Sequence, residues 1–351
     1  MTNDLQNNYQ QSAEWLEKAE NIVLVPHYNP DGDAIGSCLA LHNLLLLKGK
    51  KSIAISPNEF PEFLSWMPGS ESIYLYNRDK QIADQHILAA DLIIMVDFSS
   101  KRRLNHLEDA ILGASAKKIN IDHHPEPDQL ADILFSDTSV SSTAELIYRF
   151  IEGTNNLSYL NKDIASCIFC GIMTDTGCFS HNSSTPETYD VVSQLLRQGI
   201  NKDFIFAKVF QDYSEQRMKM LGFALSKKMV VVPELHTAYL SLTKAEMDLY
   251  NHQLGDTEGF VNIPFSIRGI ICTALFLEKE DHIKISLRSR GKYSVNDLAR
   301  AIYIGGGHRN AAGATAYLSL DESIQVFIQK LKSDQSELQA VAKEVELIDE
   351  L

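Results

Sequence analysis

The chain has 351 residues, 44% hydrophobic and 22% charged, which suits two globular domains of ordinary composition. Its formal net charge of −14 argues against a protein that coats long nucleic acid, because such binding neutralises many phosphates. No stretch approaches the roughly 20 apolar residues of a membrane-spanning helix, and we see no signal peptide. With five cysteines and no paired metal-type spacing, we expect a reduced, cytoplasmic protein without membrane contact.

In the first half of the chain, short apolar runs alternate with helical patterns. The predicted strands are residues 21–25, 52–55, 73–76, 92–96 and 118–121, and the predicted helices between them include residues 34–48 and 101–112. This alternation predicts a parallel sheet covered by helices on both faces. Ser142 and Glu145 are spaced as a capping box, which we interpret as a helix start without a further role. Pro186 is placed to begin another helix.

The pattern changes between Gly199 and Ser214. We therefore expect a first domain of residues 1–198, a linker helix to about residue 212, and a second domain of residues 213–351. The second domain is predicted to be a smaller α+β unit with strands at 229–232, 237–241, 270–277 and 282–288, and helices at 295–302 and 335–347. The helix at 295–302 leads into a glycine cluster.

Histidine and aspartate side chains follow three of the predicted strands. The groups are His27, Asp31 and Asp33 after the first strand, Asp97 after 92–96, and Asp122, His123 and His124 after 118–121. The carboxyl ends of strands in an open α/β sheet form its ligand crevice, so we expect these groups to meet. Imidazoles mixed with carboxylates suit divalent transition metals, more than one of them. The sequence therefore predicts a metallohydrolase.

Some of these residues also have simpler explanations. A carboxylate at the start of a helix can be a capping charge, which accounts for one of Asp31 and Asp33 but does not account for His27. Adjacent histidines can be structural. Asp175 lies in Thr174-Asp175-Thr176-Gly177 and taken alone resembles an ordinary helix end.

Five short motifs follow one another along the chain at compatible spacing. They are His27-Tyr28-Asn29-Pro30-Asp31-Gly32-Asp33, Val96-Asp97, Asp122-His123-His124, Gly171-Ile172-Met173-Thr174-Asp175-Thr176-Gly177 and Gly305-Gly306-Gly307-His308-Arg309. The first four resemble the motifs of DHH phosphoesterases, and the fifth resembles the DHHA1 domain that accompanies many of them. By length and layout the chain is similar to the branch of nanoRNases and phosphoadenosine-phosphate phosphatases. This resemblance implies a parallel-sheet DHH domain, a DHHA1 domain and an active site in the cleft between them.

The resemblance also assigns roles to the site residues. One metal ion would take His27, Asp31 and Asp97, and a second would take Asp33, Asp97, His123 and Asp175. Histidine ligands disfavour magnesium and permit manganese, iron, cobalt or zinc, and the family implies two Mn²⁺ ions. His124 would face the scissile phosphate as a donor or acid, and Asp122 would orient a histidine.

Basic residues gather in the second domain although the whole chain is acidic. Eight Lys or Arg residues stand against four acidic ones between Arg268 and Arg309. We expect substrate contacts from Arg268, Arg288, Gly305, Gly306, Gly307, His308 and Arg309, with the glycine N–H groups facing an anion. Arg103 could reach a phosphate, or it could be a solvated helix residue.

The resemblance implies a manganese-dependent phosphoesterase. Its substrates would be short oligoribonucleotides, cleaved to mononucleotides, and 3'-phosphoadenosine 5'-phosphate, converted to AMP. A phosphodiesterase of linear or cyclic dinucleotides is the alternative, and a non-catalytic nucleotide-binding regulator is a third candidate. The partners would be short RNA or small nucleotides, and a homodimer is compatible with this interpretation.

Overall fold

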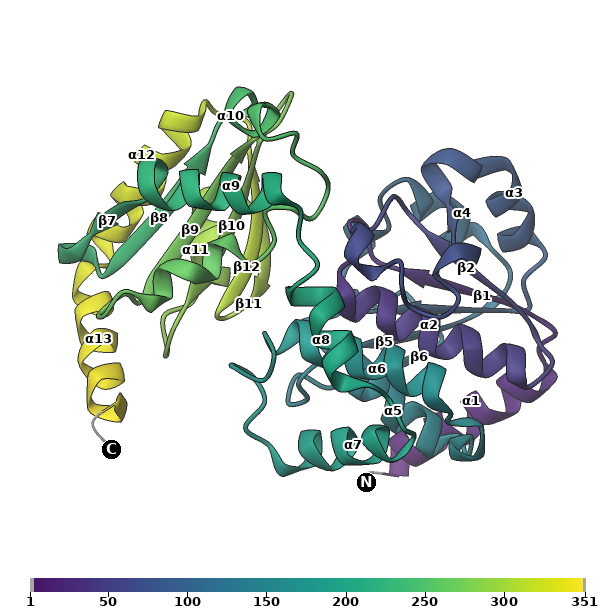
Figure 1. Ribbon diagram of the computed structural model, residues 1–351. Helices are drawn as coiled ribbons and strands as arrows, with labels where there is room; N and C mark the ends of the chain where they lie inside the picture. The colour runs from purple at the N-terminus through teal and green to yellow at the C-terminus, as the bar shows by residue number, and fades with distance from the viewer. Residues whose placement is uncertain (1–2, 350–351) are drawn as a thin grey trace. The chain divides into compact units, whose positions relative to one another are not determined.

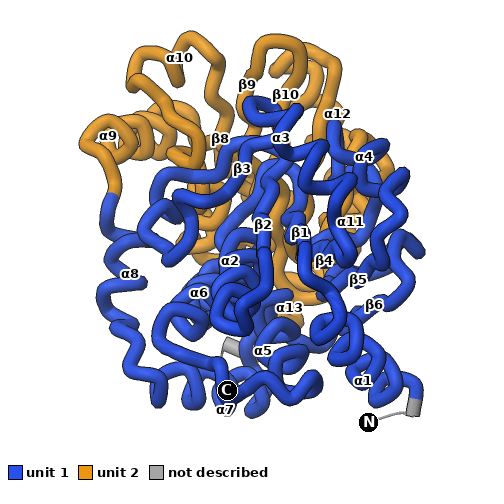
Figure 2. The backbone as a smooth tube through the Cα atoms, turned by 90° about the vertical axis from the view of Figure 1, so that its right-hand side faces the viewer, with its two compact units in different colours: residues 1–212 blue, residues 213–351 orange. Residues whose placement is uncertain are grey.

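The computed structural model describes residues 3–349 (Figure 1). The chain divides between Asp212 and Tyr213 into two compact units, called unit 1 and unit 2 below (Figure 2). Within the described residues, no helix combines the length and the apolar character needed to cross a membrane.

Unit 1 is built on a parallel sheet of six strands in the order β3-β2-β1-β4-β5-β6. The strands are β1 (Asn21–Pro26), β2 (Lys51–Ser56), β3 (Tyr74–Leu75), β4 (Leu92–Val96), β5 (Lys117–Asp122) and β6 (Ile133–Ser136). Alternate residues face opposite sides of the sheet, so Leu24 packs in one core while Val23 and Val25 pack in another. From β1 the chain adds strands first on one side, β2 and β3, and then on the other, β4 to β6. Open α/β sheets bind ligands at this switch point, between β1 and β4.

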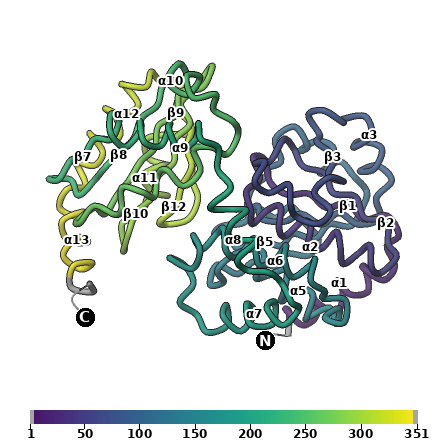
Figure 3. Tube along the Cα trace, viewed as in Figure 1, coloured from purple at the N-terminus to yellow at the C-terminus, as the bar shows by residue number. Residues whose placement is uncertain are grey.

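Helices cover both faces of this sheet, as predicted. The helices of unit 1 are α1 (Asn3–Lys18), α2 (Gly32–Leu47), α3 (Tyr76–Leu88), α4 (Glu108–Gly113), α5 (Thr143–Gly153), α6 (Lys162–Asp175), α7 (Pro186–Arg197) and α8 (Lys202–Phe210). Helices α2, α5 and α6 share the larger core with one face of the sheet. Helices α3 and α4 pack on the other face. The chain's first helix, α1, contacts α5 and β6, and Figure 3 shows α1 beside α5.

Three local predictions in unit 1 need correction. The strand expected at 73–76 is confined to Tyr74–Leu75, because α3 begins at Tyr76. The helix expected at 101–112 is a 3-10 segment, Lys101–Leu107, followed by α4, and it is broken at Asn105, where φ is +51°. The predicted capping box is only half present, because Ser142 accepts a hydrogen bond from the Glu145 N–H while the Glu145 carboxylate binds Ser141 instead.

Unit 2 contains a second sheet of six strands, in the order β11-β12-β10-β9-β8-β7. The strands are β7 (Val230–Val232), β8 (Thr237–Leu242), β9 (Cys272–Glu278), β10 (Ile283–Ser289), β11 (Ile304–His308) and β12 (Ala311–Ala316). All neighbours are antiparallel except β8 and β9.

The helices of unit 2 are α9 (Glu215–Phe223), α10 (Lys244–Leu249), α11 (Val295–Ile302), α12 (Leu320–Ser333) and α13 (Gln335–Asp349). Helices α11, α12 and α13 share one core with the sheet, centred on residues such as Phe276 and Phe327. Unit 2 is therefore the α+β fold that the sequence predicted.

Candidate active site

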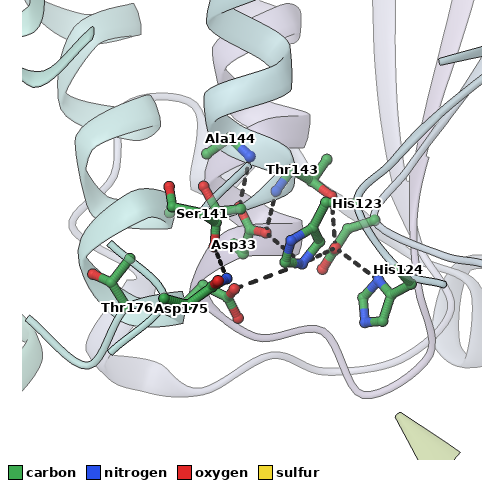
Figure 4. A network of polar contacts seen from close by, with 12 residues as sticks. Asp33, His123, His124, Ser141, Thr143, Ala144, Asp175 and Thr176 are labelled. Atoms are coloured by element: carbon green, nitrogen blue, oxygen red, sulfur yellow. Dashed lines mark hydrogen bonds and ion pairs between the residues drawn. The ribbon is translucent and has the colours of Figure 1, made fainter. Parts of the chain in front are cut away.

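The predicted metal ligands converge at the carboxyl ends of β1, β4 and β5. Two groups made only of predicted ligands form there, His27 with Asp31 and Asp97, and Asp33 with His123 and Asp175, and a third group, Asp97 with Asp122 and His124, lies beside them. Within each group the candidate ligand atoms all lie within 4.8 Å of one another. Figure 4 shows the second group, in which His123 contacts both Asp33 and Asp175.

His27 is the imidazole of the first group, and it is buried. Its Nε2 lies 3.4 Å from Asp97 Oδ2 and 3.9 Å from Asp31 Oδ2. Its Nδ1 donates to the Tyr28 carbonyl over 2.8 Å, which leaves the Nε2 lone pair facing the carboxylates without a hydrogen-bond partner. Burial and the nearby Arg103 lower the pKa of His27, but Asp31 and Asp97 outweigh them and raise it to about 9. The field at Nε2 therefore favours a positive charge, as a cation site requires.

The two carboxylate oxygens of Asp31 make different contacts. Oδ1 caps α2 by accepting from the N–H groups of Asp33, over 3.0 Å, and Ala34, over 3.1 Å. Oδ2 is turned towards His27. The capping role and the ligand role are therefore compatible in one side chain.

His123 is the imidazole of the second group, and it is also buried. Its Nε2 lies 3.6 Å from Asp175 Oδ2, 3.8 Å from Asp33 Oδ2 and 3.8 Å from Asp97 Oδ1. Burial raises the pKa of Asp33 well above its usual range, and the charges of Asp97 and Asp175 raise it further. Three carboxylates around one imidazole thus form a cluster that a bound cation would stabilise.

Asp97 faces both groups at once. Its Oδ2 lies 3.4 Å from His27 Nε2, and its Oδ1 lies 3.8 Å from His123 Nε2. The residue follows β4 directly with φ at +65°, a conformation that is uncommon outside glycine. Its N–H donates to the Ile121 carbonyl over 2.9 Å, which fixes this turn to the end of β5. Such strained backbone is typical of functional positions.

Asp175 ends α6, and this helix approaches the site because of Gly171. A Cβ at Gly171 would lie 2.5 Å from Ala144 Cβ and 2.9 Å from Asp33 Oδ1. Any side chain there would separate α6 from α2 and α5. The glycine therefore allows Asp175 to share a group with Asp33.

His124 lies beside the two groups and contacts Asp122 and Arg103. Its Nδ1 is 2.8 Å from Asp122 Oδ1, and its Nε2 is 3.2 Å from Arg103 Nη1. A guanidinium can only donate, so Nε2 accepts and the ring proton of a neutral His124 lies on Nδ1, directed at Asp122. Arg103 also donates to the Asp97 carbonyl over 3.1 Å. Arg103 is therefore half-buried and hydrogen-bonded beside these groups.

Thr143 was missed by the sequence analysis, which interpreted its neighbourhood only as a helix start. Its hydroxyl donates to Asp97 Oδ1 over 2.8 Å, and its N–H donates to Asp33 Oδ2 over 2.7 Å. The signal in the sequence was a threonine directly after the capping Ser142, in the first turn of a helix whose N–H groups need acceptors.

The predicted substrate-binding residues of unit 2 lie mostly along one edge of its sheet. Gly305, Gly306 and Gly307 belong to the edge strand β11 rather than to a loop. The N–H of Gly307 donates to Asn296 Oδ1 over 2.9 Å, so an anion would have to compete with this side chain for that N–H group.

Strand pairing brings two of the predicted basic residues onto one face. Ala311 pairs with His308 of β11 on one side and with Arg288 of β10 on the other, so all three side chains project from the same face. Arg309 is exposed beyond the end of β11. Arg268 is exposed between the 3-10 segment Phe260–Ser266 and β9, apart from this strand group.

The comparisons with known proteins identify the family of both domains. Residues 21–172 match the DHH family, N-terminal domain, and residues 255–337 match the DHHA1 domain. The chain is 30% identical over 311 residues to the bifunctional oligoribonuclease and PAP phosphatase NrnA of Bacillus subtilis, covering 88% of this chain and 92% of that protein. It is 27% identical to NrnA of Thermus thermophilus, covering 92% and 93% of the two chains.

A solved structure extends the likeness to the fold. The crystal structure of an exopolyphosphatase-related protein from Bacteroides fragilis superposes with a TM-score of 0.91 at 42% identity, covering 95% of this chain and 98% of that one. With both domains matched in order and relatives aligned over nearly their full length, the chain belongs to the DHH/DHHA1 family of phosphoesterases.

Proposed function

We propose that this protein is a manganese-dependent phosphoesterase that cleaves short oligoribonucleotides to mononucleotides and 3'-phosphoadenosine 5'-phosphate to AMP. The observation that carries the proposal is the pair of donor groups at the carboxyl ends of β1, β4 and β5, with Asp97 in one group and 3.8 Å from His123 of the other. The substrate class is supported by the names of the Bacillus and Thermus relatives, which align with nearly all of this chain.

The donor set fits two divalent transition-metal ions. Each group supplies one imidazole nitrogen, together with carboxylate oxygens, and Asp97 is placed to serve both. Mn²⁺ accepts this mixture, whereas Mg²⁺ prefers oxygen ligands alone. When bound, such a pair of ions would polarise the phosphate oxygens and activate the attacking water.

His124, Asp122 and Arg103 are proposed to act on the substrate beside the metal centre. Arg103 is a permanent cation within hydrogen-bond distance of His124, so an incoming phosphate would compete for its guanidinium. In its imidazolium form His124 would then donate its Nε2 proton to the phosphate or to the leaving oxygen, while Asp122 holds its Nδ1.

Unit 2 is proposed to bind the end of the substrate that is not cleaved. His308 and Arg288 project from one face of its sheet, and Arg309 lies at the end of that edge strand. Arginine suits bidentate contact with phosphate. Two Mn²⁺ ions per chain, a cytoplasmic location and assembly as a homodimer are part of this proposal, and equilibrium sedimentation of the purified protein would test the last.

A substrate panel tests the proposal directly. Di- to decanucleotides, cyclic dinucleotides, 3'-phosphoadenosine 5'-phosphate and pyrophosphate would each be assayed with Mn²⁺ and with Mg²⁺. We expect the highest kcat/KM on the shortest oligoribonucleotides and on the bisphosphate, with Mn²⁺. Hydrolysis of none of these substrates with Mn²⁺ would instead support the nucleotide-binding regulator, against which the complete donor set argues.

A phosphodiesterase of linear or cyclic dinucleotides is the second candidate. The chain is 22% identical over 321 residues to the cyclic-di-AMP phosphodiesterase GdpP of Bacillus subtilis, but it aligns with only 47% of that protein. The same panel separates the two candidates. A dinucleotide phosphodiesterase should have a higher kcat/KM on a cyclic or linear dinucleotide than on 3'-phosphoadenosine 5'-phosphate.

A further inference from the structure

We infer that Thr143 is a positioning residue that holds two of the metal-ligand carboxylates in register, and that Glu145 anchors it. This inference rests on the proposed metal centre. It concerns the segment Ser141–Glu145, for which the sequence predicted only a helix cap.

Thr143 contacts two ligands that come from different parts of unit 1. Its hydroxyl donates to Asp97 Oδ1 over 2.8 Å, at the end of β4. Its N–H donates to Asp33 Oδ2 over 2.7 Å, in the first turn of α2, and the Ala144 N–H donates to Asp33 Oδ1 over 2.8 Å. Figure 4 shows both N–H groups pointing at Asp33. One buried residue therefore sets the separation of the two carboxylates.

The hydroxyl contact matters because Asp97 faces both donor groups. A carboxylate oxygen has two lone-pair directions, and the Thr143 hydroxyl occupies one on Oδ1. The other direction remains for a cation beside His123, whose Nε2 is 3.8 Å from Oδ1. Fixing Oδ1 also fixes the plane of the carboxylate, and with it Oδ2 towards His27. Hydrogen bonds that orient a ligand in this way are usually worth a large factor in metal affinity.

The Glu145 carboxylate holds the turn that leads into Thr143. This carboxylate is fully buried, and one oxygen accepts from the Ser141 N–H over 3.1 Å, the Ser141 hydroxyl over 2.7 Å and the Thr188 hydroxyl over 2.8 Å. Its other oxygen is paired with Arg149. Glu145 therefore ties the turn before α5 to the helix itself and to α7. A capping-box glutamate would have bound the N-cap N–H instead.

The test replaces the Thr143 hydroxyl and leaves its backbone unchanged. Thr143→Val keeps the branched shape and the N–H contact with Asp33 but removes the donor to Asp97. Thr154→Val is the matched control, because Thr154 is a buried threonine at the other end of α5, where its hydroxyl donates to the Phe150 carbonyl. Metal-free protein would be titrated with Mn²⁺ by calorimetry, and the Mn²⁺ dependence of hydrolysis would be measured in parallel.

We expect Thr143→Val to weaken Mn²⁺ binding by about 10–100-fold, the usual effect of losing a group that orients a metal ligand. Thr154→Val should bind Mn²⁺ like the unaltered protein. Thr143→Ser, which restores the hydroxyl, should recover most of the affinity. Equal Mn²⁺ affinity for the Thr143→Val and Thr154→Val proteins would overturn the inference. So would a Thr143→Ser protein as weak as Thr143→Val, because the methyl group would then be responsible.

Two further measurements distinguish a failure of this inference from a failure of the proposed metal centre and from misfolding of Thr143→Val. If the unaltered protein itself binds no Mn²⁺, the proposed metal centre fails, whatever Thr143 does. If Thr143→Val does not fold, Thr143→Ser and Thr143→Ala form a pair that differs by the hydroxyl alone. Melting temperatures without metal should match within that pair, whereas Mn²⁺ affinity should differ by the same 10–100-fold, about as expected for an orienting contact. Equal affinities in that pair would again overturn the inference.

Discussion

The candidate metal site of unit 1 and the glycine-containing edge strand β11 of unit 2 differ in how deeply their residues are buried. In unit 1 the candidate ligands His27, Asp33, Asp97 and His123 are all at most 3% exposed, and neighbouring elements contact them on several sides. In unit 2 the glycine cluster, His308 and Arg309 lie on the edge strand β11 and the turn after it, half-buried or exposed. Chemistry that depends on exact ligand placement needs the first kind of site, whereas binding of varied substrate ends tolerates the second.

The difference predicts how mutations at the two sites should behave. Replacements in unit 1 should affect metal content and the chemical step on every substrate. Replacements in unit 2 should affect only substrates that extend beyond the scissile phosphate, because binding energy from remote contacts positions the reacting bond.

The largest effect is expected for Asp97→Ala. Both donor groups lose their shared carboxylate, so activity should fall to the assay background and at least one of the two proposed ions should be lost. Elemental analysis of the purified protein and turnover on all panel substrates would check this. Asp84→Ala is the control, because it removes a partly exposed aspartate on α3 that pairs with Lys80. Full metal content with normal turnover in Asp97→Ala would end the two-metal assignment.

The next effect is expected for His124→Ala. It should retain its metal but lose rate by about 10²–10⁴-fold, the usual contribution of a positioned acid or donor. His106→Ala removes an exposed histidine from the 3-10 segment Lys101–Leu107 and should change neither quantity. A collapse of metal occupancy in His124→Ala would make His124 a ligand instead of a group acting on the substrate.

The sequence was enough to predict the sheet, the family and the residues that meet at its carboxyl ends. The sheet and the meeting of residues at its carboxyl ends were predicted from strand periodicity and from the rule that parallel strands share one ligand edge. The family and the role of Asp175 were predicted from the resemblance of the motifs. The strand at Leu92–Val96 was located to the residue, and Asp97 follows it directly.

What the sequence analysis missed depends on contacts between distant segments. The pairing of Thr143 with Asp33 and Asp97 joins residues 110 and 46 positions apart. The glycine cluster was expected to offer its N–H groups to an anion, because nothing in the sequence shows that β12 pairs with it or that Asn296 binds Gly307. Glycine is uncommon within strands, so the sequence did not predict β11, and only its pairing with β12 identifies it as a strand.

A smaller and selective effect is expected for the double replacement His308→Ala with Arg309→Ala. A small chromogenic phosphodiester needs only the metal centre, so its hydrolysis should change little. Turnover of dinucleotides and of 3'-phosphoadenosine 5'-phosphate should fall at least tenfold, because one charge-assisted contact contributes about 1.5–3 kcal/mol. Lys292→Ala, which removes an exposed basic residue elsewhere in unit 2, should leave both rates near normal. An equal loss of rate on the small phosphodiester and on the nucleotide substrates would show that His308 and Arg309 support the fold or the chemistry.

The smallest effect on rate is expected for Gly307→Ala, compared with Gly306→Ala. Gly307 has φ at +153°, and a Cβ there would lie 2.5 Å from the Ala311 carbonyl oxygen, whereas a Cβ at Gly306 would meet only the side chains of Asn296 and Arg300, at 3.3 and 3.4 Å. Rate with the small phosphodiester should stay near normal in both.

Gly307→Ala should lower the free energy of unfolding of unit 2 by about 1–3 kcal/mol, the usual cost of a strained backbone position. Gly306→Ala should lower it little, because a strand gains about 0.5–1 kcal/mol when alanine replaces glycine and side chains can move aside. Hydrogen exchange of the β11 and β12 amides reports on this unit separately from unit 1. Equal exchange rates in the two variants would mean that β11 tolerates a side chain at Gly307, and the glycines would then have to be explained by the substrate.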